Sequence, residues 1–212
     1  RVFLDREFTA KLRVIKKDSD TKQTVLVPNA EFKIFNIDKN EYVKQYTTYP
    51  SKVEHTSFFT DEDGDLILPE ALKIGNYRIE EVSAPFGYVV NDKYVNISVD
   101  TDIAFETDGD TNDAIITVEY SDAPAVGELT VEKKGEVLDG FKGGLFASLY
   151  EKEFVYKEGS LAGAKFKVYA AEDIYTADNQ KDADGNRIKY YSKGDLVATL
   201  TTGKDGKAVA KN

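Results

Sequence analysis

The chain repeats itself in three short blocks that recur in the same order. The paired blocks are LRVIKKD (12–18) with LTVEKKG (129–135), NAEFKIFN (29–36) with GAKFKVYA (163–170), and FFTDEDGDLIL (58–68) with LTTGKDGKAVA (200–210). The spacing between copies grows along the chain, which indicates longer loops in the second copy. Repeats of this size predict an array of like modules, and such arrays serve more often as spacers or binding surfaces than as catalysts.

Short runs rich in β-branched and aromatic residues, separated by turn dipeptides, predict an all-β chain. Tight turns are expected at Asp63-Gly64, Asp184-Gly185 and Asp205-Gly206. Many short strands with tight turns favour a sandwich or barrel of antiparallel sheets. The clear strand candidates are 10–17, 30–37, 42–48, 53–60, 64–68, 75–82, 93–99 and 114–121.

Composition excludes several classes of function. The chain has 212 residues with 41% apolar and 12% aromatic residues, enough for one or two domains with a packed core. The net charge of −10 argues against nucleic acid as a partner, and no apolar run reaches the length of a membrane span. The chain has no cysteine, and His55 is its only histidine, so we expect no disulfide, metal site or cofactor. Because there is no initiator Met, signal peptide or sorting motif, we expect an internal piece of a longer protein.

Three predicted strands each carry an ionisable residue at the end of an apolar face. Side chains alternate across a sheet, so residues two apart share a face. By this rule Lys16, Glu81 and Asp122 continue the apolar faces of their strands, while the other charges of these strands lie on the opposite face. The second copy carries Lys133 at the position of Lys16. The pattern predicts a buried Lys–Glu–Asp cluster, although a one-residue slip of register would present Lys17 instead.

The first copy also resembles a known family. The run GNYRIEEVSAPFGY (75–88) resembles the pattern G-x-Y-x-h-x-E-x-x-A-P-x-G-Y of the Cna B-type, or SpaA-like, modules of Gram-positive surface proteins and pilins, and the blocks at 12–18, 29–36 and 60–64 agree with it. The resemblance implies a prealbumin-like Greek-key β-sandwich over residues 10–124. Residues 1–9 are then a lead-in from a preceding module, and 125–127 a linker, where Pro124 and small residues interrupt the strand pattern. Residues 128–212 would form an incomplete second module.

This resemblance implies a spontaneous isopeptide bond between Lys16 and Asp122, with Glu81 as the assisting acid. The residue types suit the chemistry, because an amine attacks a carboxyl only when the amine is neutral and the carboxyl protonated, and burial favours both neutral forms. Glu81 would shuttle protons as a catalytic group in a reaction that runs once, so we expect no enzyme turnover. The residues alone leave a second interpretation open, a buried ion-paired triad without a bond.

Lys133 is expected to remain a free amine. When the second copy is aligned on the first, the counterparts of Glu81 and Asp122 fall beyond Asn212. The intact chain should therefore weigh one water less than calculated, and the loss of a second water would contradict this expectation.

The resemblance favours a structural stalk or spacer of a cell-wall-anchored adhesin or pilin-like protein, located outside the cell. Its partners would be neighbouring modules of the same chain, and a host surface protein or glycan is a further candidate. Two alternatives stay open: a module that binds a host protein or glycan directly, and an ancillary domain of a large secreted enzyme. An aromatic stretch, 141–160, is either a ligand-binding loop or an insertion that packs on the module.

Overall fold

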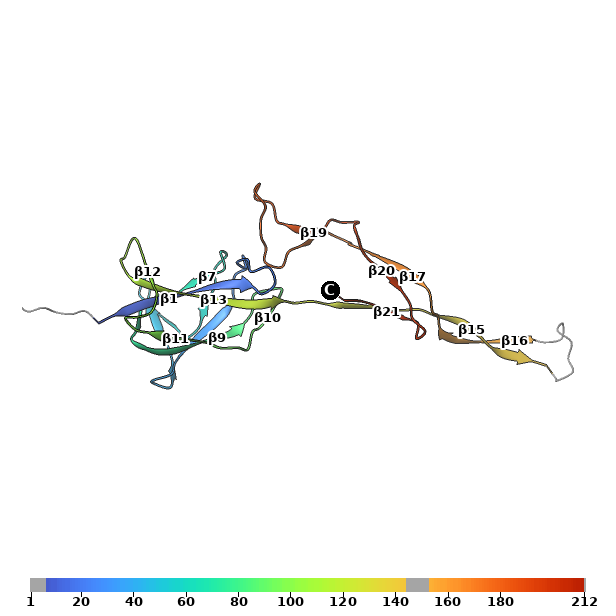
Figure 1. Cartoon of the computed structure of the whole chain (residues 1–212), viewed down its shortest axis with the longest axis horizontal. Coiled ribbons are helices and arrows are strands. Elements are labelled where there is room, and N and C mark those ends of the chain that lie inside the picture. The colour runs from blue at the N-terminus through green and yellow to red at the C-terminus, as the bar shows by residue number, and fades with distance from the viewer. Residues whose placement is uncertain (1–6, 144–152, 212) are drawn as a thin grey trace, which may run out of the picture. The chain divides into compact units, whose positions relative to one another are not determined.

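A computed structural model describes residues 7–143 and 153–211. The regular secondary structure of these residues consists of β-strands (Figure 1). The predicted all-β class is confirmed. Contacts divide the chain into two units. Unit 1 comprises Arg1–Ala125 and Thr176–Ile188, and unit 2 comprises Val126–Tyr175 and Lys189–Asn212. The described residues include no helix that could cross a membrane.

The first sheet of unit 1 holds the first and last strands of the module side by side. Its strand order is β10 (Tyr88–Val89), β13 (Ala114–Pro124), β1 (Thr9–Asp18) and β7 (Asp65–Ile67), with β12 (Glu106–Thr107) added to β13 and β8 (Leu72–Lys73) added to β1. β1 and β13 run parallel, whereas the other neighbouring strands pair antiparallel. The chain therefore enters along β1 and leaves in the same direction along the neighbouring strand (Figure 1).

The second sheet is antiparallel throughout. Its order is β11 (Val95–Val99), β9 (Gly75–Ser83), β2 (Glu31–Asn36) and β3 (Glu41–Tyr42), with β6 (Phe58–Phe59) also paired with β2. The pairing of β2 with β9 contains a bulge, because Glu31 faces Ser83 while Phe32 faces Glu81. A bulge of this kind redirects the neighbouring side chains. Here it lies next to Glu81.

The core of unit 1 lies between the two sheets and follows from strict alternation. Every second residue of β1 and of β2 is buried and the residues between them are half-buried, so each strand buries one face. The buried hydrophobic cluster takes members from both sheets, which identifies a sandwich. Its members are Ala10, Leu12, Val14, Ala30, Phe32, Ile34, Phe58, Leu66, Leu68, Leu72, Tyr77, Ile79, Val99, Ile116 and Tyr120.

Two predicted strands are each split in the structure. The region 42–48 contains the end of β3 and then β4 (Gln45–Thr47), and 53–60 contains β5 (Val53–His55) and then β6. β3 and β6 pair with different parts of β2, while β4 and β5 pair with each other. The chain thus leaves β2 after β3, forms a separate hairpin and returns at β6. Alternation of side chains does not reveal this departure.

The turn at Asp63-Gly64 is confirmed, and its glycine is required. Gly64 has a φ of 73°, and a Cβ at this position would lie 2.1 Å from the carbonyl oxygen of Val25. Its own carbonyl oxygen accepts a hydrogen bond from the amide of Lys16 at 2.8 Å. Any other side chain would push apart the backbone that supports Lys16.

In unit 2 the described strands form four two-stranded ribbons. They are β14 (Glu128–Glu132) with β21 (Lys207–Lys211), β15 (Lys134–Lys142) with β16 (Glu153–Ser160), β17 (Lys165–Tyr169) with β20 (Leu196–Thr201), and β18 (Ile174–Tyr175) with β19 (Lys189–Tyr191). Few of its described residues are buried: Ala170, Leu200, Thr202, Gly206 and Ala208. Two aromatic residues of the stretch 141–160, Phe146 and Tyr150, lie outside the described residues.

Several backbone contacts of unit 2 repeat those of unit 1. The backbone amide of Lys133 donates to the carbonyl oxygen of Gly206 at 2.8 Å, and the backbone amide of Lys16 donates to that of Gly64 at 2.8 Å. The registers of β14 with β21 and of β1 with β7 also correspond when the repeat blocks are aligned. That residues 128–212 form an incomplete second module stays a prediction, as do the predicted bounds.

One segment far along the chain belongs to unit 1. In the segment 176–188, Asp178 is buried, and its carbonyl oxygen accepts a hydrogen bond from the amide of Leu26 at 2.8 Å. The side chain of Asn179 donates to Leu26 O at 3.1 Å, and that of Gln180 donates to Thr24 O at 2.6 Å. The predicted bounds 10–124 did not include this segment.

Candidate functional site

The three predicted site residues come from three neighbouring strands around one end of the core. Lys16 lies on the buried face of β1, Asp122 on that of β13, and Glu81 on β9 of the opposite sheet. In the parallel pairing of β1 with β13, Lys16 lies opposite Tyr120. Asp122 is two residues further along the same face, within reach of the long lysine side chain.

The structure brings the three side chains into direct contact. Lys16 Nζ lies 2.7 Å from Glu81 Oε1 and 2.5 Å from Asp122 Oδ1. All three side chains are 0% exposed. The lysine amine thus sits between two carboxyl groups in a site without access to solvent.

Two aromatic rings form the walls of the site. The Lys16 Nζ atom lies 4.7 Å from the ring centre of Tyr120 and 5.6 Å from that of Phe32. The rings contact each other edge to face, with centres 5.1 Å apart. Rings of this kind exclude water, and their π faces interact favourably with a cation.

Burial sets the protonation chemistry of the acceptor. It raises the pKa of Asp122 to about 7, although the hydrogen bond and charge of Lys16 act in the opposite direction. Asp122 Oδ2 is buried and has no hydrogen-bond partner within the described residues. One amine beside two carboxyl groups cannot balance two negative charges in a dry site, so a protonated Asp122 is favoured near neutral pH.

Lys17 lies on the other face of β1. Its Nζ atom contacts Thr24 Oγ1 at 3.1 Å and Glu119 Oε1 at 3.4 Å, and its side chain is 19% exposed. The register therefore presents Lys16, rather than its neighbour, to the two buried carboxyl groups.

Lys133 is exposed, unlike its counterpart in the first copy. The described residues show no ion pair of its amine, and the nearby strands β14 and β21 form only a two-stranded ribbon. The structure thus brings Lys16, Glu81 and Asp122 together and leaves Lys133 apart from them.

The sequence interpretation missed the loop that closes the site. Asn91, between β10 and β11, donates its backbone amide to Glu81 Oε2 at 2.9 Å and its side-chain amide to Ser121 O at 2.8 Å. The hydroxyl of Tyr120 donates toward the carbonyl oxygens of Asn91 at 3.0 Å and Lys93 at 2.6 Å. A signal existed for Tyr120, which shares the face of Asp122, but nothing in the sequence pattern pointed to Asn91.

A further buried carboxylate, outside the triad, lies at the end of β1 and has a different environment. Asp18 Oδ2 accepts a hydrogen bond from Tyr88 Oη at 2.8 Å, and its Oδ1 accepts from the amides of Asp20 and Thr21. Burial raises the pKa of Asp18, but the hydrogen bonds from Thr21, Tyr88 and Asp20 outweigh it and hold the pKa below its usual value. Asp18 is thus a satisfied, ionised carboxylate that caps a turn.

His55 and the acidic turn at 61–65 have partners within the fold. His55 Nε2 lies 2.9 Å from Thr47 Oγ1 in the β4–β5 hairpin. Asp61 Oδ1 accepts the amides of Asp63 and Asp65, as an ordinary turn does. No group of three or more His, Cys, Asp or Glu side chains in the described part of the chain is placed to hold a metal ion.

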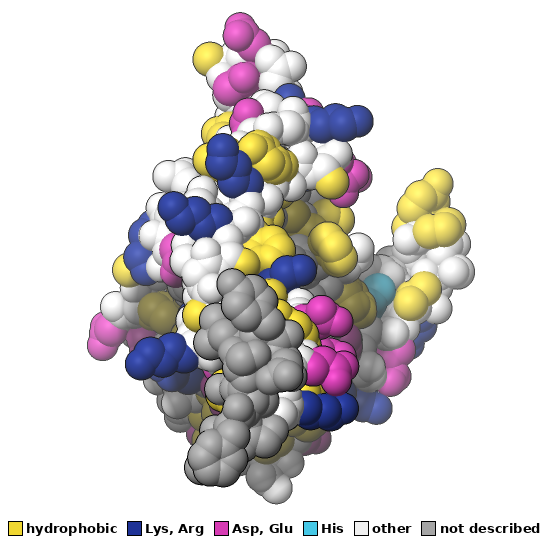
Figure 2. All heavy atoms as spheres, turned by 90° about the vertical axis from the view of Figure 1, so that its right-hand side faces the viewer, with side chains coloured by type: hydrophobic (Ala, Val, Ile, Leu, Met, Phe, Trp, Pro, Cys, Tyr) yellow, Lys and Arg dark blue, Asp and Glu magenta, His cyan; other side chains and the backbone are white. Residues whose placement is uncertain are grey.

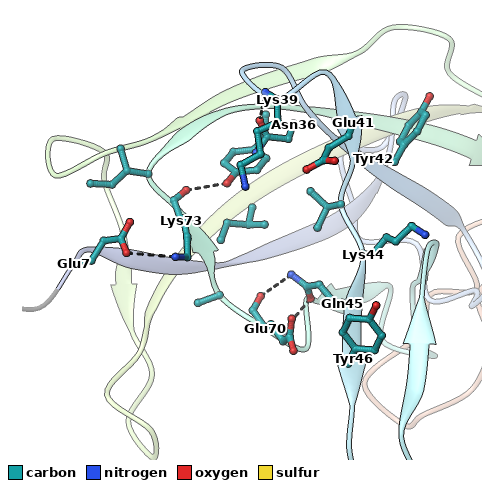
Figure 3. A pocket seen from close by; sticks show the side chains of 15 residues that line it. Glu7, Asn36, Lys39, Glu41, Tyr42, Lys44, Gln45, Tyr46, Glu70 and Lys73 are labelled. Atoms are coloured by element: carbon teal, nitrogen blue, oxygen red, sulfur yellow. Dashed lines mark hydrogen bonds and ion pairs between the residues drawn. The ribbon is translucent and has the colours of Figure 1, made fainter.

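A hollow of 840 Å³ lies on unit 1 near β3, β4 and β8. Figure 3 shows several of its polar groups bonded within the protein: Gln45 exchanges two hydrogen bonds with the backbone of Glu70, and Lys73 pairs with Glu7. On the face in Figure 2, basic and acidic side chains are interspersed instead of gathered into one charged patch. Neither feature presents the converging unpaired groups of a ligand site.

The buried triad can therefore do one kind of chemistry without any further group. An amine, a protonated carboxyl and a second carboxyl lie within contact distance in a dry and rigid pocket. This arrangement suits condensation of the first two, because fixed geometry replaces a bimolecular encounter with an effective concentration of roughly 10⁵ M or more.

Comparison with protein-family models matches residues 10–113 to a family described as SpaA, prealbumin-like fold domain. A comparison with curated proteins finds no match.

Among solved structures, the chain is similar to the TIE protein of Bacillus anthracis, with 22% identity and a TM-score of 0.51 over 97% of this chain and 26% of that one. It also matches the group B streptococcus pilus 2b backbone protein, with 21% identity, a TM-score of 0.42, and 54% and 41% of the two chains covered. The shaft pilin SpaA of Lactobacillus rhamnosus GG matches with 19% identity, a TM-score of 0.40, and 57% and 49% covered.

The chain spans less than half the length of each of these structures. The likeness to the first of them supports the fold alone. The family match covers Lys16 and Glu81 and ends before β13, which carries Asp122, and it agrees with the resemblance inferred from the sequence. Residues 10–113 of this chain belong to the SpaA family of prealbumin-like fold domains.

Proposed function

We propose that the chain is a stalk module of a Gram-positive pilus or surface protein that carries tension. In this proposal an isopeptide bond between Lys16 and Asp122 cross-links the module. One observation carries this proposal: the Lys16 amine lies 2.5 Å from a carboxyl oxygen of Asp122 and 2.7 Å from Glu81 in a fully buried site. Such a module acts outside the cell, with neighbouring modules as its partners.

The reaction is a condensation that needs no co-reactant. A bond forms between Lys16 Nζ and Asp122 Cγ, and one Cγ–O bond of Asp122 breaks. The oxygen leaves as water with the proton that Asp122 already carries and one proton from the lysine ammonium. The other proton that the ammonium loses stays on Glu81, so that charge and atoms balance. Glu81 takes a proton from the attacking nitrogen and delivers it to the departing oxygen. The step runs once per molecule and is self-processing, without turnover of a substrate.

A bond at this place suits a stalk because of the parallel pairing of β1 with β13. Tension that enters at the start of β1 and leaves at the end of β13 shears these two strands past each other. A covalent link from Lys16 to Asp122 would carry that tension directly from one strand to the other. The intervening sandwich would then stay outside the path of force.

The test is the mass of the intact chain, followed by peptide mapping. The wild type should weigh one water less than its sequence, and proteolysis should yield a branched peptide that joins the segments around Lys16 and Asp122. Lys16→Ala, Glu81→Ala and Asp122→Ala should each restore the full mass, whereas Lys17→Ala should not. A wild-type chain of full mass would refute the bond and leave an ion-paired triad.

A further inference from the structure

The assisting carboxyl group is held by a part of the chain that lies outside all three strands of the triad. Glu81 has two carboxyl oxygens with different partners. Oε1 faces the Lys16 amine at 2.7 Å, and Oε2 accepts the backbone amide of Asn91 at 2.9 Å. The two oxygens therefore have different roles in any proton transfer.

The amide of Asn91 fixes which oxygen can carry a proton. The backbone amide keeps its proton, so Oε2 remains an acceptor, whereas Oε1 faces an ammonium group that can release a proton. A proton taken up by Glu81 therefore resides on Oε1, beside the reacting nitrogen. The same hydrogen bond prevents rotation of the carboxyl group, which would otherwise exchange the two oxygens.

The loop of Asn91 is hydrogen-bonded to β13, the strand that carries the acceptor. We call the bonds of Asn91 and Lys93 to Tyr120 and Ser121 the latch. The Asn91 side chain donates to Ser121 O, and its Oδ1 accepts the amide of Lys93 at 3.1 Å. The buried phenol of Tyr120 donates toward the carbonyl oxygens of Asn91 and Lys93. The residues Tyr120 and Ser121 directly precede Asp122, so this latch ties the position of the acid to the position of the acceptor.

We infer that Asn91 is a positioning residue for isopeptide formation, which acts through its backbone amide on Glu81 and is held in place by Tyr120. This inference rests on the proposed function. Its chemistry is that of the proposed condensation, in which Glu81 Oε1 receives the proton from Lys16 Nζ and passes it to the departing oxygen of Asp122.

The experiment measures the rate of cross-linking in variants that release the latch from either side. Asn91→Ala removes the bond to Ser121, and Tyr120→Phe removes the bonds to the loop while keeping the ring against Lys16. Chains are made by cell-free translation, translation is stopped, and acid-quenched samples are weighed to follow the loss of water. Each variant should link roughly tenfold or more slowly, as expected for a misplaced hydrogen bond to a charged group.

Two controls separate positioning from general stability. Asn96→Ala, at an exposed site on β11, should link at the wild-type rate. The double variant should be about as slow as the slower single variant, because both changes act through one N–H group. Loss of folding would instead slow the reaction only in proportion to the unfolded fraction, which circular dichroism measures on the same samples.

A spectroscopic measurement tests the contact even if a variant fails to fold. In Lys16→Ala protein, which cannot link, the backbone amide resonance of Asn91 should shift upon Glu81→Gln but not upon Glu80→Gln. Wild-type cross-linking rates in both Asn91→Ala and Tyr120→Phe would overturn the inference. An Asn91 amide resonance that does not shift upon Glu81→Gln would overturn it as well. A wild type that never loses water would instead refute the proposed function, and the resonance would still report on the contact.

Discussion

Lys16 and Lys17 are adjacent residues of the same type, and their environments differ completely. The amine of Lys16 is fully buried between two carboxyl groups, whereas that of Lys17 reaches Glu119 near the surface. Exposed ion pairs contribute little to stability, with a median of about 0–1 kcal/mol. The two lysines therefore form a matched pair for testing the site.

We predict that Lys16→Ala lowers the free energy of unfolding far more than Lys17→Ala does. By the chain-entropy model, a cross-link that closes a loop of roughly 100 residues contributes about 4.7 kcal/mol, and Lys16→Ala also removes the cation between two buried carboxyl groups. Lys17→Ala should cost less than about 1 kcal/mol. Denaturant unfolding of the two variants measures both values, and equal losses would contradict the site assignment.

The raised pKa of Asp122 gives a second prediction, for a chain that cannot link. Glu81→Gln should block linking yet leave Asp122 buried, and burial is the largest cause of the raised pKa. The native state then keeps a proton on Asp122 to a higher pH than the unfolded chain, which releases it near the ordinary value of 3.8. Because the native state binds more protons in this window, stability should fall as the pH rises above about 4 and should level off once the native state has also released the proton.

The linked wild type is the control for this pH dependence. Its Asp122 would be an amide and could not titrate. The contribution of Asp122 to the pH dependence of the unfolding free energy should therefore be absent. Tyr120, whose pKa is raised to about 12, does not change charge in this window, and Asp18 is common to both proteins. Urea unfolding of both proteins at several pH values gives the comparison. The same slope in both proteins would mean that Asp122 is not the group responsible.

At the scale of strands, alternation alone located the triad, because a buried charge at the end of an apolar face is rare enough to be informative. The same alternation could not show how far each residue lies from the others in space. The latch of Asn91 depends on a loop conformation between β10 and β11, and loops carry no period that a sequence pattern reveals. The splitting of the predicted strands at 42–48 and 53–60 also depends on tertiary pairing with β2.

The sequence pattern did not predict the contact of the segment 176–188 with the rest of unit 1, for a similar reason. Its hydrogen bonds join backbone groups of Leu26 and Thr24 to Asp178, Asn179 and Gln180. The partners are more than 150 residues apart and carry no charge or apolar pattern that would link them. Only the folded chain relates the two segments.

We predict that Gln180→Ala weakens this contact locally. Its side-chain amide donates to Thr24 O at 2.6 Å, next to the amide of Leu26, which donates to Asp178 O. Hydrogen exchange of the peptide that contains Leu26 should quicken roughly five- to tenfold, as expected for the loss of about 1 kcal/mol from one neutral hydrogen bond. Asn186→Ala is the matched control, because the side chain of Asn186 bonds to Asp182 in its own turn, and it should leave the exchange of that peptide unchanged.

For the molecule under load, the position of the proposed bond would matter more than its contribution to equilibrium stability. The parallel neighbours β1 and β13 are the strands by which the chain enters and leaves the sandwich. Without a bond, tension shears one ladder of backbone hydrogen bonds, and its rupture releases the whole module. With a bond from Lys16 to Asp122, the residues between them cannot extend, whatever happens to the ladder.

Single-molecule pulling on the whole chain, with attachment points at residues 7 and 125, distinguishes these cases. The Glu81→Ala variant should unfold in a step that adds roughly 350–380 Å of contour more than the wild type, because about 105 released residues each extend by about 3.3–3.6 Å. Lys17→Ala should behave like the wild type, since its amine lies outside the site. A wild-type chain that extends as far as Glu81→Ala would show that tension passes through the sandwich, and a stalk built on this module would then depend on strand pairing alone.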